Sequence, residues 1–392
     1  YSWYLRNPEY RSRVQKLVQS AFAGKPKDII SQSVAKALYG EVSPYSATRL
    51  ERFAACAFAH FLQYGMKLTE RVEYEFKPMD MGNVMHEALE SFAEEVRKRG
   101  MKWTELTEQE RNEIADRCLD NIVADYGNTV LKSSARNEYM IERTRRILRR
   151  TVWALQKQLE QGEFQPEGFE VTFGGGRIDR VDIMEDQNKV YVKVIDYKTG
   201  NTSFDLVYLY HGLQLQLMIY LDGALRVEQK KYPDKEIIPA GVFYYNIKDP
   251  MIQEKIDADV EAVSAGLMKE LKMNGLVQAD PELVYRMDSS LGSIPVAFNK
   301  DGNFRKNSSV ADRTQFAVLG RYVRTKIEKI RSSILEGDAE VSPYELGKKN
   351  ACTYCPYMTV CGFDRRLSGY EFRRLKNFSD EELWKAFDRE AE

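Results

Sequence analysis

The stretch GGGRIDRVDIMEDQNKVYVKVIDYKTG, residues 174–200, decides the fold and the chemistry predicted for this chain. Two runs of alternating apolar residues flank the polar residues 186–188, a pattern that predicts two β-strands joined by a polar turn. On the second strand, the period of two places Asp196 and Lys198 on the same face as the valines that precede them. An apolar face therefore ends in a carboxylate and an ammonium group.

The first strand brings a second carboxylate to this place. Asp179 belongs to the apolar face of that strand, and a connection spanning Asp186 to Lys189 places it opposite Asp196, with Cβ atoms roughly 5 Å apart. Two facing carboxylates repel each other unless a cation lies between them, and hard divalent cations prefer carboxylate oxygens. The sequence therefore predicts a metal site with a lysine beside it.

This arrangement suits phosphodiester hydrolysis. Mg²⁺ or Mn²⁺ held by two aspartates lowers the pKa of a bound water and polarises phosphoryl oxygens, while Lys198 orients the water or neutralises charge on the phosphate. The alternative is a hairpin whose Asp196 and Lys198 form an ordinary surface ion pair. The tripeptide alone does not decide, because Glu228-Gln229-Lys230, at the end of a predicted helix, also fits D/E-x-K.

Composition sets wider bounds. The 392 residues suffice for a large core and more than one module. A net charge of −1 and a pI near 6.5 require any basic nucleic-acid surface to be local. We find no membrane-spanning apolar run and no signal peptide, so we expect a cytoplasmic protein. Because the chain opens at Tyr1 in an aromatic-rich segment, we expect a fragment of a longer polypeptide.

Helical periodicity surrounds the hairpin on both sides. Helices are predicted over about 8–39 with a break at 24–26, over 46–65 with a break at Cys56, and over 80–99, 108–126, 135–161, 213–229, 256–273 and 311–335. A further buried strand is predicted over 237–247 and a turn over 301–303. Strand, strand, helix, strand with helices around them predicts an α/β fold with a small mixed sheet.

Three helical side chains gain interest from the hairpin. His86 lies at the edge of the buried face of the 80–99 helix, as either a packed core histidine or a ligand of a nearby metal. Gln216 and Tyr220 lie one turn apart and would face the sheet edge that carries Lys198, although such residues are usually packing residues.

In the 135–161 helix, the basic run Arg143–Arg150 fits phosphate contacts, a solvated face or a subunit contact.

The cysteines form a second constellation. Cys352, Cys355 and Cys361 follow the pattern C-x2-C-x5-C, which favours a metal site over a redox dithiol. A tetrahedral centre needs a fourth ligand, and Cys56 and Cys118 are the only remaining cysteines. A lone cysteine such as Cys56 is usually a small buried hydrophobe, and we interpret Cys118 as structural. Zinc and an iron–sulfur cluster both fit this spacing.

These motifs together resemble a known family. G-R-I-D around Asp179, D-Y-K at 196–198, Q-x-x-x-Y at 216–220 and the helical His86 resemble the RecB-like branch of the PD-(D/E)XK nucleases. The cysteine arrangement, with one cysteine before these motifs and C-x2-C-x5-C after them, is similar to that of the iron–sulfur nucleases. It resembles above all the C-terminal nuclease domain of the AddB family, the B subunits of bacterial AddAB helicase–nucleases. LERFAACAFAHFLQYGMKL and ACTYCPYMTVCGFD carry the same likeness, which extends from about Ser46 to the end.

The resemblance implies roles for individual residues. Metal ligands would be Asp179, Asp196 and His86, and the main-chain carbonyl of Tyr197 is a further candidate because its side chain faces away. Lys198 would be the catalytic lysine, with support from Gln216 and Tyr220. A [4Fe–4S] cluster that ties the two ends of the domain together and helps hold duplex DNA ends would be bound by Cys56, Cys352, Cys355 and Cys361.

It also implies an organisation and partners. We expect a helical lead-in over 1–45, a nuclease domain over 46–370 and a helical tail over 371–392; within the domain, 46–65 and 350–363 are cluster segments and 165–250 the catalytic core. The substrate would be single-stranded DNA unwound during double-strand break repair and recombination. The motor would belong to the A subunit, since this sequence has no G-x4-G-K-[ST].

Two alternatives remain at this point. A CRISPR-associated iron–sulfur exonuclease shares the histidine, D-Y-K, Q-x-x-x-Y and four-cysteine layout, but is usually a much shorter chain. A non-catalytic module that binds DNA ends or acts as a scaffold would retain only a relic site. The intact Asp179, Asp196 and Lys198 argue against a relic, because a buried charge cluster costs stability and would be lost by drift.

Overall fold

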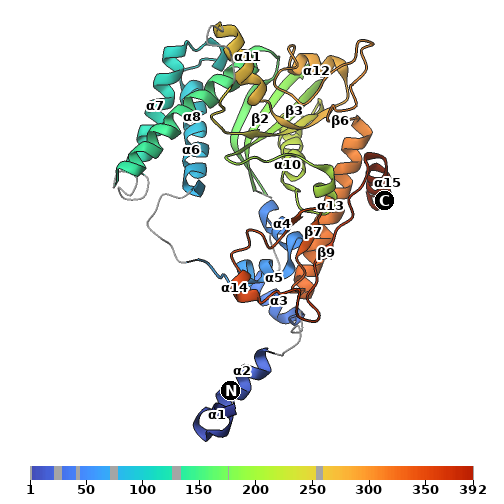
Figure 1. Cartoon of the computed structure of the whole chain (residues 1–392). Coiled ribbons are helices and arrows are strands. Elements are labelled where there is room, and N and C mark those ends of the chain that lie inside the picture. The colour runs from blue at the N-terminus through green and yellow to red at the C-terminus, as the bar shows by residue number, and fades with distance from the viewer. Residues whose placement is uncertain are drawn as a thin grey trace. The chain divides into compact units, whose positions relative to one another are not determined.

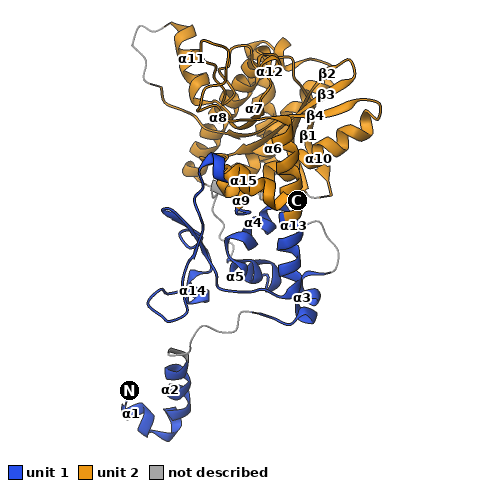
Figure 2. Cartoon of the chain, turned by 90° about the vertical axis from the view of Figure 1, so that its right-hand side faces the viewer, with its two compact units in different colours: residues 1–70, 211–213, 326–382 blue, residues 71–210, 214–325, 383–392 orange. Residues whose placement is uncertain are grey.

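The computed structural model of the chain describes residues 2–21, 29–40, 45–70, 78–125, 134–174, 176–252 and 259–391. The chain divides into two compact units (Figure 2). Unit 1 comprises Tyr1–Glu70, His211–Leu213 and Lys326–Glu382, and unit 2 comprises Arg71–Tyr210, Gln214–Thr325 and Leu383–Glu392. The hairpin belongs to unit 2, and the C-x2-C-x5-C segment belongs to unit 1.

Unit 2 contains a mixed sheet of six strands in sequence order, which confirms the predicted α/β class (Figure 1). The strands are β1 (Gln165–Phe173), β2 (Gly176–Asp186), β3 (Lys189–Lys198), β4 (Glu236–Asn246), β5 (Asn274–Gln278) and β6 (Val310–Ala311). The β1–β2, β2–β3 and β4–β5 pairs are antiparallel, and the β3–β4 and β5–β6 pairs are parallel. The apolar patterns of β2, β3 and β4 predicted them as strands, whereas β1, β5 and β6 were not predicted.

The predicted hairpin register is correct. Asp186 pairs with Lys189, so Gln187 and Asn188 alone form the connection between β2 and β3. β1 escaped notice because Pro166 and Gly168 weaken a strand pattern, and the register of β1 on β2 shifts between these two residues.

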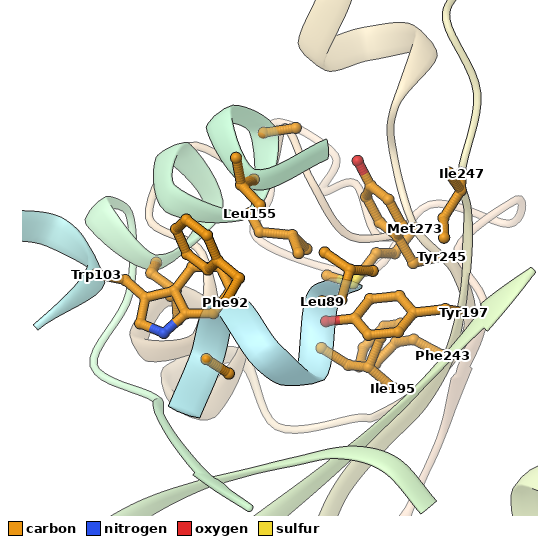
Figure 3. Close-up of a cluster of buried hydrophobic side chains, with 14 of the residues drawn as sticks. Leu89, Phe92, Trp103, Leu155, Ile195, Tyr197, Phe243, Tyr245, Ile247 and Met273 are labelled. Atoms are coloured by element: carbon orange, nitrogen blue, oxygen red, sulfur yellow. The ribbon is translucent and has the colours of Figure 1, made fainter. Parts of the chain in front are cut away.

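The two faces of β3 have different partners. Tyr191, Ile195 and Tyr197 belong to a hydrophobic core with α6 (Pro78–Lys98), α7 (Glu108–Asp125) and α8 (Ala135–Glu160), part of which Figure 3 shows. The alternate residues Val190, Val192 and Val194 are fully buried outside that core, and α10 (Gln216–Lys231) packs against β2, β3 and β4. Each such side chain contributes about 1.5–3 kcal/mol by burial, so both faces define the register.

A buried ion network also fixes this register. Asp182 pairs across the hairpin with Lys193, and its carboxylate lies 3.0 Å from the Lys193 ammonium. It also accepts hydrogen bonds of 2.5 and 2.8 Å from the guanidinium of Arg180. All three side chains are buried. A slip of one residue would separate Lys193 from Asp182 and leave the buried ammonium without this partner, which costs several kcal/mol.

The other helical elements of unit 2 are the 3₁₀ turn Trp103–Glu105, α9 (Leu206–Tyr210), α11 (Val260–Glu270), α12 (Pro281–Met287) and the larger part of α15 (Asp380–Ala391). The helices predicted from the sequence are present to within a few residues of their predicted ends, whereas the 3₁₀ turn, α9 and α12 were not predicted. The predicted helix ends at residues 126 and 256–258 lie outside the described residues. The long helix α13 (Arg313–Glu336) contributes residues to both units.

Unit 1 is built from short elements. It contains α1 (Ser2–Arg6), α2 (Pro8–Ala21), α3 (Gln32–Tyr39), α4 (Ala47–Ala55), α5 (Ala57–His60), a π-helical turn (Phe61–Gly65), α14 (Met358–Cys361) and the strands β7 (Tyr344–Leu346), β8 (Lys349–Asn350) and β9 (Arg373–Arg374). The predicted break at residues 24–26 lies outside the described residues, whereas the break at Cys56, between α4 and α5, is confirmed. None of the described helices is long and apolar enough to cross a membrane.

Candidate active site

Three carboxylates lie side by side across the first three strands of the sheet. The register on either side of Glu170 places this residue of β1 opposite Asp179 on β2. One residue beyond the last β2–β3 pair, Asp179 lies opposite Asp196 on β3. Cross-strand neighbours have Cβ atoms about 4.5–5.5 Å apart, so Asp179 on the middle strand lies close to both other carboxylates.

His86 reaches this row from α6. Its Nδ1 lies 3.4 Å from Oδ2 of Asp179 and 3.9 Å from Oε1 of Glu170. Burial would lower the pKa of His86, but the contacts with Asp179 and Glu170 outweigh burial and raise the pKa to about 10. In the protein without a metal, a protonated His86 therefore supplies the positive charge that the carboxylates require.

The ligand atoms of His86, Glu170 and Asp179 lie within 4.8 Å of one another, which makes them the one such group among the described residues able to hold a metal ion. Asp179 is oriented by the backbone, because Oδ2 accepts a 2.6 Å hydrogen bond from the N–H of Tyr197. One nitrogen with two carboxylates is a donor set that suits a divalent cation such as Mg²⁺ or Mn²⁺.

Asp196 lies outside that group, although it faces Asp179. Its carboxylate is fully buried, and its Oδ2 lies 2.5 Å from Nζ of Lys198. Burial and the charge of Asp179 raise the pKa of Asp196 to about 7, against the opposing effect of Lys198. Among the described residues, Oδ2 accepts no hydrogen bond of normal geometry, so this buried oxygen can still accept a cation.

Lys198 is held from several directions. Its ammonium lies over the ring of Tyr244 at 5.4 Å and donates a 2.8 Å hydrogen bond to Oε1 of Gln216 on α10. The amide of Gln216 in turn donates a 2.9 Å hydrogen bond to the hydroxyl of Tyr220. The predicted position of Gln216 and Tyr220 at the sheet edge that carries Lys198 is therefore correct. α10 thus positions the lysine head group beside Asp196.

Sequence reasoning missed Glu170. Its side chain is only 7% exposed, and its backbone has a φ of 49°, a left-handed conformation that is uncommon for a residue other than glycine. The sequence did contain a signal for it. Phe173 pairs with Gly176, and counting outward from this pair along both strands places Glu170 opposite Asp179. Only a prediction of β1 as a strand would have revealed it.

Residues 44–362 match the sequence profile of the PD-(D/E)XK nuclease superfamily. The chain belongs to this superfamily. Curated relatives named as the B subunit of an ATP-dependent helicase/deoxyribonuclease are 42% identical over 405 residues in Lachnoclostridium phytofermentans and 34% identical over 414 residues in Clostridium acetobutylicum. These alignments cover 97% and 100% of this chain but 35% and 36% of the relatives. The chain thus spans about a third of the length of the relatives it matches.

Other residues singled out from the sequence lie elsewhere in the PD-(D/E)XK fold. The ring of Tyr197 packs in the helix-side core, where Figure 3 labels it beside Ile195 and Phe243. Glu228, in the competing E-Q-K tripeptide, is buried, and its Oε1 lies 2.9 Å from Nζ of Lys231. Within the part of the chain that the structure describes, Glu228 makes no ion pair with the residues of the carboxylate row.

The basic run on α8 is largely neutralised by acidic neighbours. Arg145 contacts Asp120 at 2.7 Å, Arg149 is paired with Asp116, and Arg146 contacts Asp249 at 2.6 Å. Arg150 lies over the ring of Trp153 at 5.6 Å. Most of this run therefore has a protein partner already, and we assign it no role at the nuclease site.

The cysteines of unit 1 share one location. Cys56, Cys352, Cys355 and Cys361 line a small apolar cavity of about 20 Å³, whereas Cys118 is buried in the core of unit 2. Burial and then the three other cysteines raise the pKa of Cys352 to about 12. Among the described residues, no three of these sulfur atoms lie within 4.8 Å of one another, so the thiols do not form a closed ligand set for a single ion.

Proposed function

We propose that this chain is the metal-dependent deoxyribonuclease module of a helicase–nuclease complex. Its reaction would be hydrolysis of phosphodiester bonds in single-stranded DNA that is unwound during double-strand break repair and recombination. The observation that carries the proposal is that His86 of α6 meets Asp179, Asp196 and Lys198 of the sheet in a PD-(D/E)XK nuclease fold. Identity along the whole chain to the B subunits of helicase/deoxyribonucleases favours this function over a CRISPR-associated exonuclease.

A divalent cation fits the site on two grounds. The donor set of His86, Glu170 and Asp179 suits it, and the buried Oδ2 of Asp196 lacks a well-aligned hydrogen bond among the described residues. We assign these four side chains and the main-chain carbonyl of Tyr197 as the residues that hold Mg²⁺ or Mn²⁺. The ion, when bound, supplies an acidified water and charge for the phosphoryl oxygens.

The remaining residues act on the DNA and the water. Lys198 donates hydrogen bonds to a phosphoryl oxygen or to the attacking water, because its ammonium lies beside Asp196 and its side chain is 27% exposed. Gln216 fixes the direction of that ammonium, and Tyr220 fixes Gln216. Through these hydrogen bonds α10 keeps Lys198 at the reacting phosphate.

We assign an iron–sulfur cluster to the cavity lined by Cys56, Cys352, Cys355 and Cys361. The lining is apolar and contains four thiols from both ends of unit 1, which suits the thiolate ligands of a [4Fe–4S] cluster. Its role would be structural, as a link between the two segments.

The proposed organisation follows the sequence expectations. Residues 46–370 would form the nuclease domain, with residues 165–250 as catalytic core and 46–65 and 350–363 as cluster segments, between a lead-in over 1–45 and a tail over 371–392. The partner would be an A subunit of the AddA type that carries the helicase motor, since the similar proteins are named as B subunits. We infer a cytoplasmic location, because the proposed substrate is chromosomal DNA.

The test separates metal binding from catalysis. Asp196→Ala should weaken Mn²⁺ binding and abolish cleavage of a single-stranded oligonucleotide, because a ligand is lost. Lys198→Ala should keep Mn²⁺ binding while cleavage falls by about a hundredfold or more, because a charged donor to the phosphate is lost. Calorimetric Mn²⁺ titration and a gel-based cleavage assay measure the two quantities.

Lys230→Ala is the matched control, because Lys230 belongs to the competing E-Q-K tripeptide and is exposed at the end of α10. Its cleavage and Mn²⁺ binding should equal those of the parent chain. Undiminished cleavage by Lys198→Ala, or unchanged Mn²⁺ binding by Asp196→Ala, would remove this site from consideration.

A further inference from the structure

Arg177 lies beside the carboxylate row but has no part in the function proposed above. It precedes Asp179 by two residues on β2, so the period of two places both side chains on the same face of the sheet. Its Nε lies 2.5 Å from Oε2 of Glu170, whose other oxygen faces His86. One carboxylate therefore joins the metal-binding group to an arginine.

The two partners of this ion pair differ sharply in exposure. The Glu170 side chain is 7% exposed, whereas the Arg177 side chain is 62% exposed. Glu170 is also fixed by its left-handed backbone and by its contact with His86. The carboxylate is thus a fixed anchor for one edge of the guanidinium, and the rest of the Arg177 side chain is open to solvent at the rim of the site.

Phosphate binding explains this arrangement of Arg177 better than a contribution to folding stability does. An ion pair whose cation is mostly exposed contributes little to folding, because solvent screens that charge and the arginine side chain loses rotamer entropy. A guanidinium carries five N–H donors in a plane and binds phosphate oxygens through two of them at once. With Nε directed at Glu170, the plane of Arg177 is oriented before any ligand arrives, which reduces the entropic cost of binding.

We propose that Arg177 binds a backbone phosphate of the DNA strand next to the phosphate that is cleaved, with its guanidinium oriented by Glu170. This inference rests on the proposed nuclease function of the site. It makes Arg177 a substrate-binding residue of the nuclease, in addition to the residues implied by the D-Y-K and Q-x-x-x-Y motifs.

The experiment measures DNA binding without cleavage. Binding of a fluorescent single-stranded oligonucleotide is followed by anisotropy in EDTA over a series of NaCl concentrations. Arg177→Gln should weaken binding about fivefold to tenfold, since one charge-assisted phosphate contact is lost. The slope of log affinity against log salt should become shallower by about 0.7, the value for one phosphate contact on a single strand.

Arg226→Gln is the matched control. Arg226 is 68% exposed and paired with Asp222 within α10, so it resembles Arg177 in exposure and in pairing but is anchored to its own helix. Its variant should retain the affinity and the salt slope of the parent chain. Arg177→Lys should keep the salt slope but not the full affinity, because the charge remains and the planar pair of donors does not.

A Glu170→Gln background distinguishes a direct contact between Arg177 and DNA from an indirect effect of Arg177 on Glu170. In Glu170→Gln the anchor loses its charge, and Arg177→Gln added to it should still weaken binding and flatten the salt slope. If the effect of Arg177→Gln disappears in that background, or if Arg177→Gln binds like the parent chain, the inference is wrong. A parent chain that cleaves DNA in Mn²⁺ while Arg177→Gln binds normally would overturn this inference alone. A parent chain that neither binds nor cleaves DNA would reject the proposed function and this inference with it.

Discussion

Glu170 is the residue that most changes the interpretation of the site. It adds a third carboxylate to the pair recognised from the sequence and shares the close ligand group with His86 and Asp179. Its positive φ costs of the order of 1 kcal/mol or more, which the surrounding strand pairing must offset. Strain of this kind at a residue with a buried carboxylate is consistent with selection for the position of its side chain rather than for stability.

The role of Glu170 in metal binding is testable by one atom-for-atom substitution. Glu170→Gln should lower Mn²⁺ affinity about tenfold or more, because an anionic ligand becomes a neutral amide of the same shape. Glu167→Gln, three residues earlier on β1 and paired at the surface with Lys231, should bind Mn²⁺ like the parent chain. Equal Mn²⁺ affinities of the two variants in calorimetric titration would exclude Glu170 as a ligand.

His60 in unit 1 makes stability depend on pH. It is fully buried, and its Nε2 accepts a 3.1 Å hydrogen bond from Nε of Arg49, which requires the neutral ring. Burial and then the charge of Arg49 lower the pKa of His60 from 6.5 to about 3. Between these values the unfolded chain binds more protons than the folded chain, so stability is complete above pH 6.5 and is lost as pH falls toward 3.

The expected loss from pH 7.5 to pH 5 is about 2 kcal/mol in the free energy of opening of unit 1. Hydrogen–deuterium exchange of peptides from residues 47–65 measures this quantity locally. His60→Gln, which keeps an acceptor for Arg49 but does not titrate, should lack that part of the pH dependence. A parent chain and a variant with the same pH dependence would contradict this assignment to His60.

At the scale of elements, two helical glycines have opposite surroundings. A Cβ at Gly223 in α10 would lie 2.6 Å from the ring of Phe173, whereas a Cβ at Gly320 in α13 would have its nearest neighbour, the Arg324 guanidinium, at 3.8 Å. Phe173 also packs edge-on against Tyr220, with ring centroids 5.9 Å apart. The close approach at Gly223 therefore links the position of α10 to the end of β1.

The same substitution should consequently have opposite effects. Gly320→Ala should stabilise unit 2 by about 0.5–1 kcal/mol, because alanine loses less conformational entropy in a helix. Gly223→Ala should destabilise it by about 1–3 kcal/mol through overpacking against Phe173, and should lower cleavage because Tyr220 is displaced. Urea unfolding and the cleavage assay check both; equal stability changes would refute the packing argument.

At the scale of the whole molecule, the cysteines distinguish the two units. Under the proposed cluster, Cys56→Ser should lose iron and sulfide and raise hydrogen exchange in residues 47–65 and 349–363, while exchange in the unit 2 sheet stays unchanged. Cys118→Ser should keep its iron, because Cys118 is buried in the unit 2 core. Iron analysis and visible absorption of anaerobically purified protein decide this. Iron lost from Cys118→Ser but kept by Cys56→Ser would reverse the assignment.

The local sequence pattern was enough to predict which residues lie at the centre of the site. The period of two on β3 predicted that Asp196 and Lys198 share a face, and the two-residue turn after Asp186 predicted that Asp179 lies opposite Asp196. The period of 3.6 on α6 predicted its buried face, with His86 at the edge. These inferences succeeded because each depends on the geometry of one element or one tight turn.

Contacts between elements distant in sequence needed the tertiary structure. Glu170 enters the site because β1 bends between Pro166 and Gly168 and because its own φ is positive, and neither feature has a periodic signal. The hydrogen bond from Lys198 to Gln216 depends on how α10 packs on the sheet. The sequence by itself determined which strand faces carry charge. The packing of one element on another decided which charges meet, because distances between elements depend on the summed burial of many side chains rather than on any local repeat.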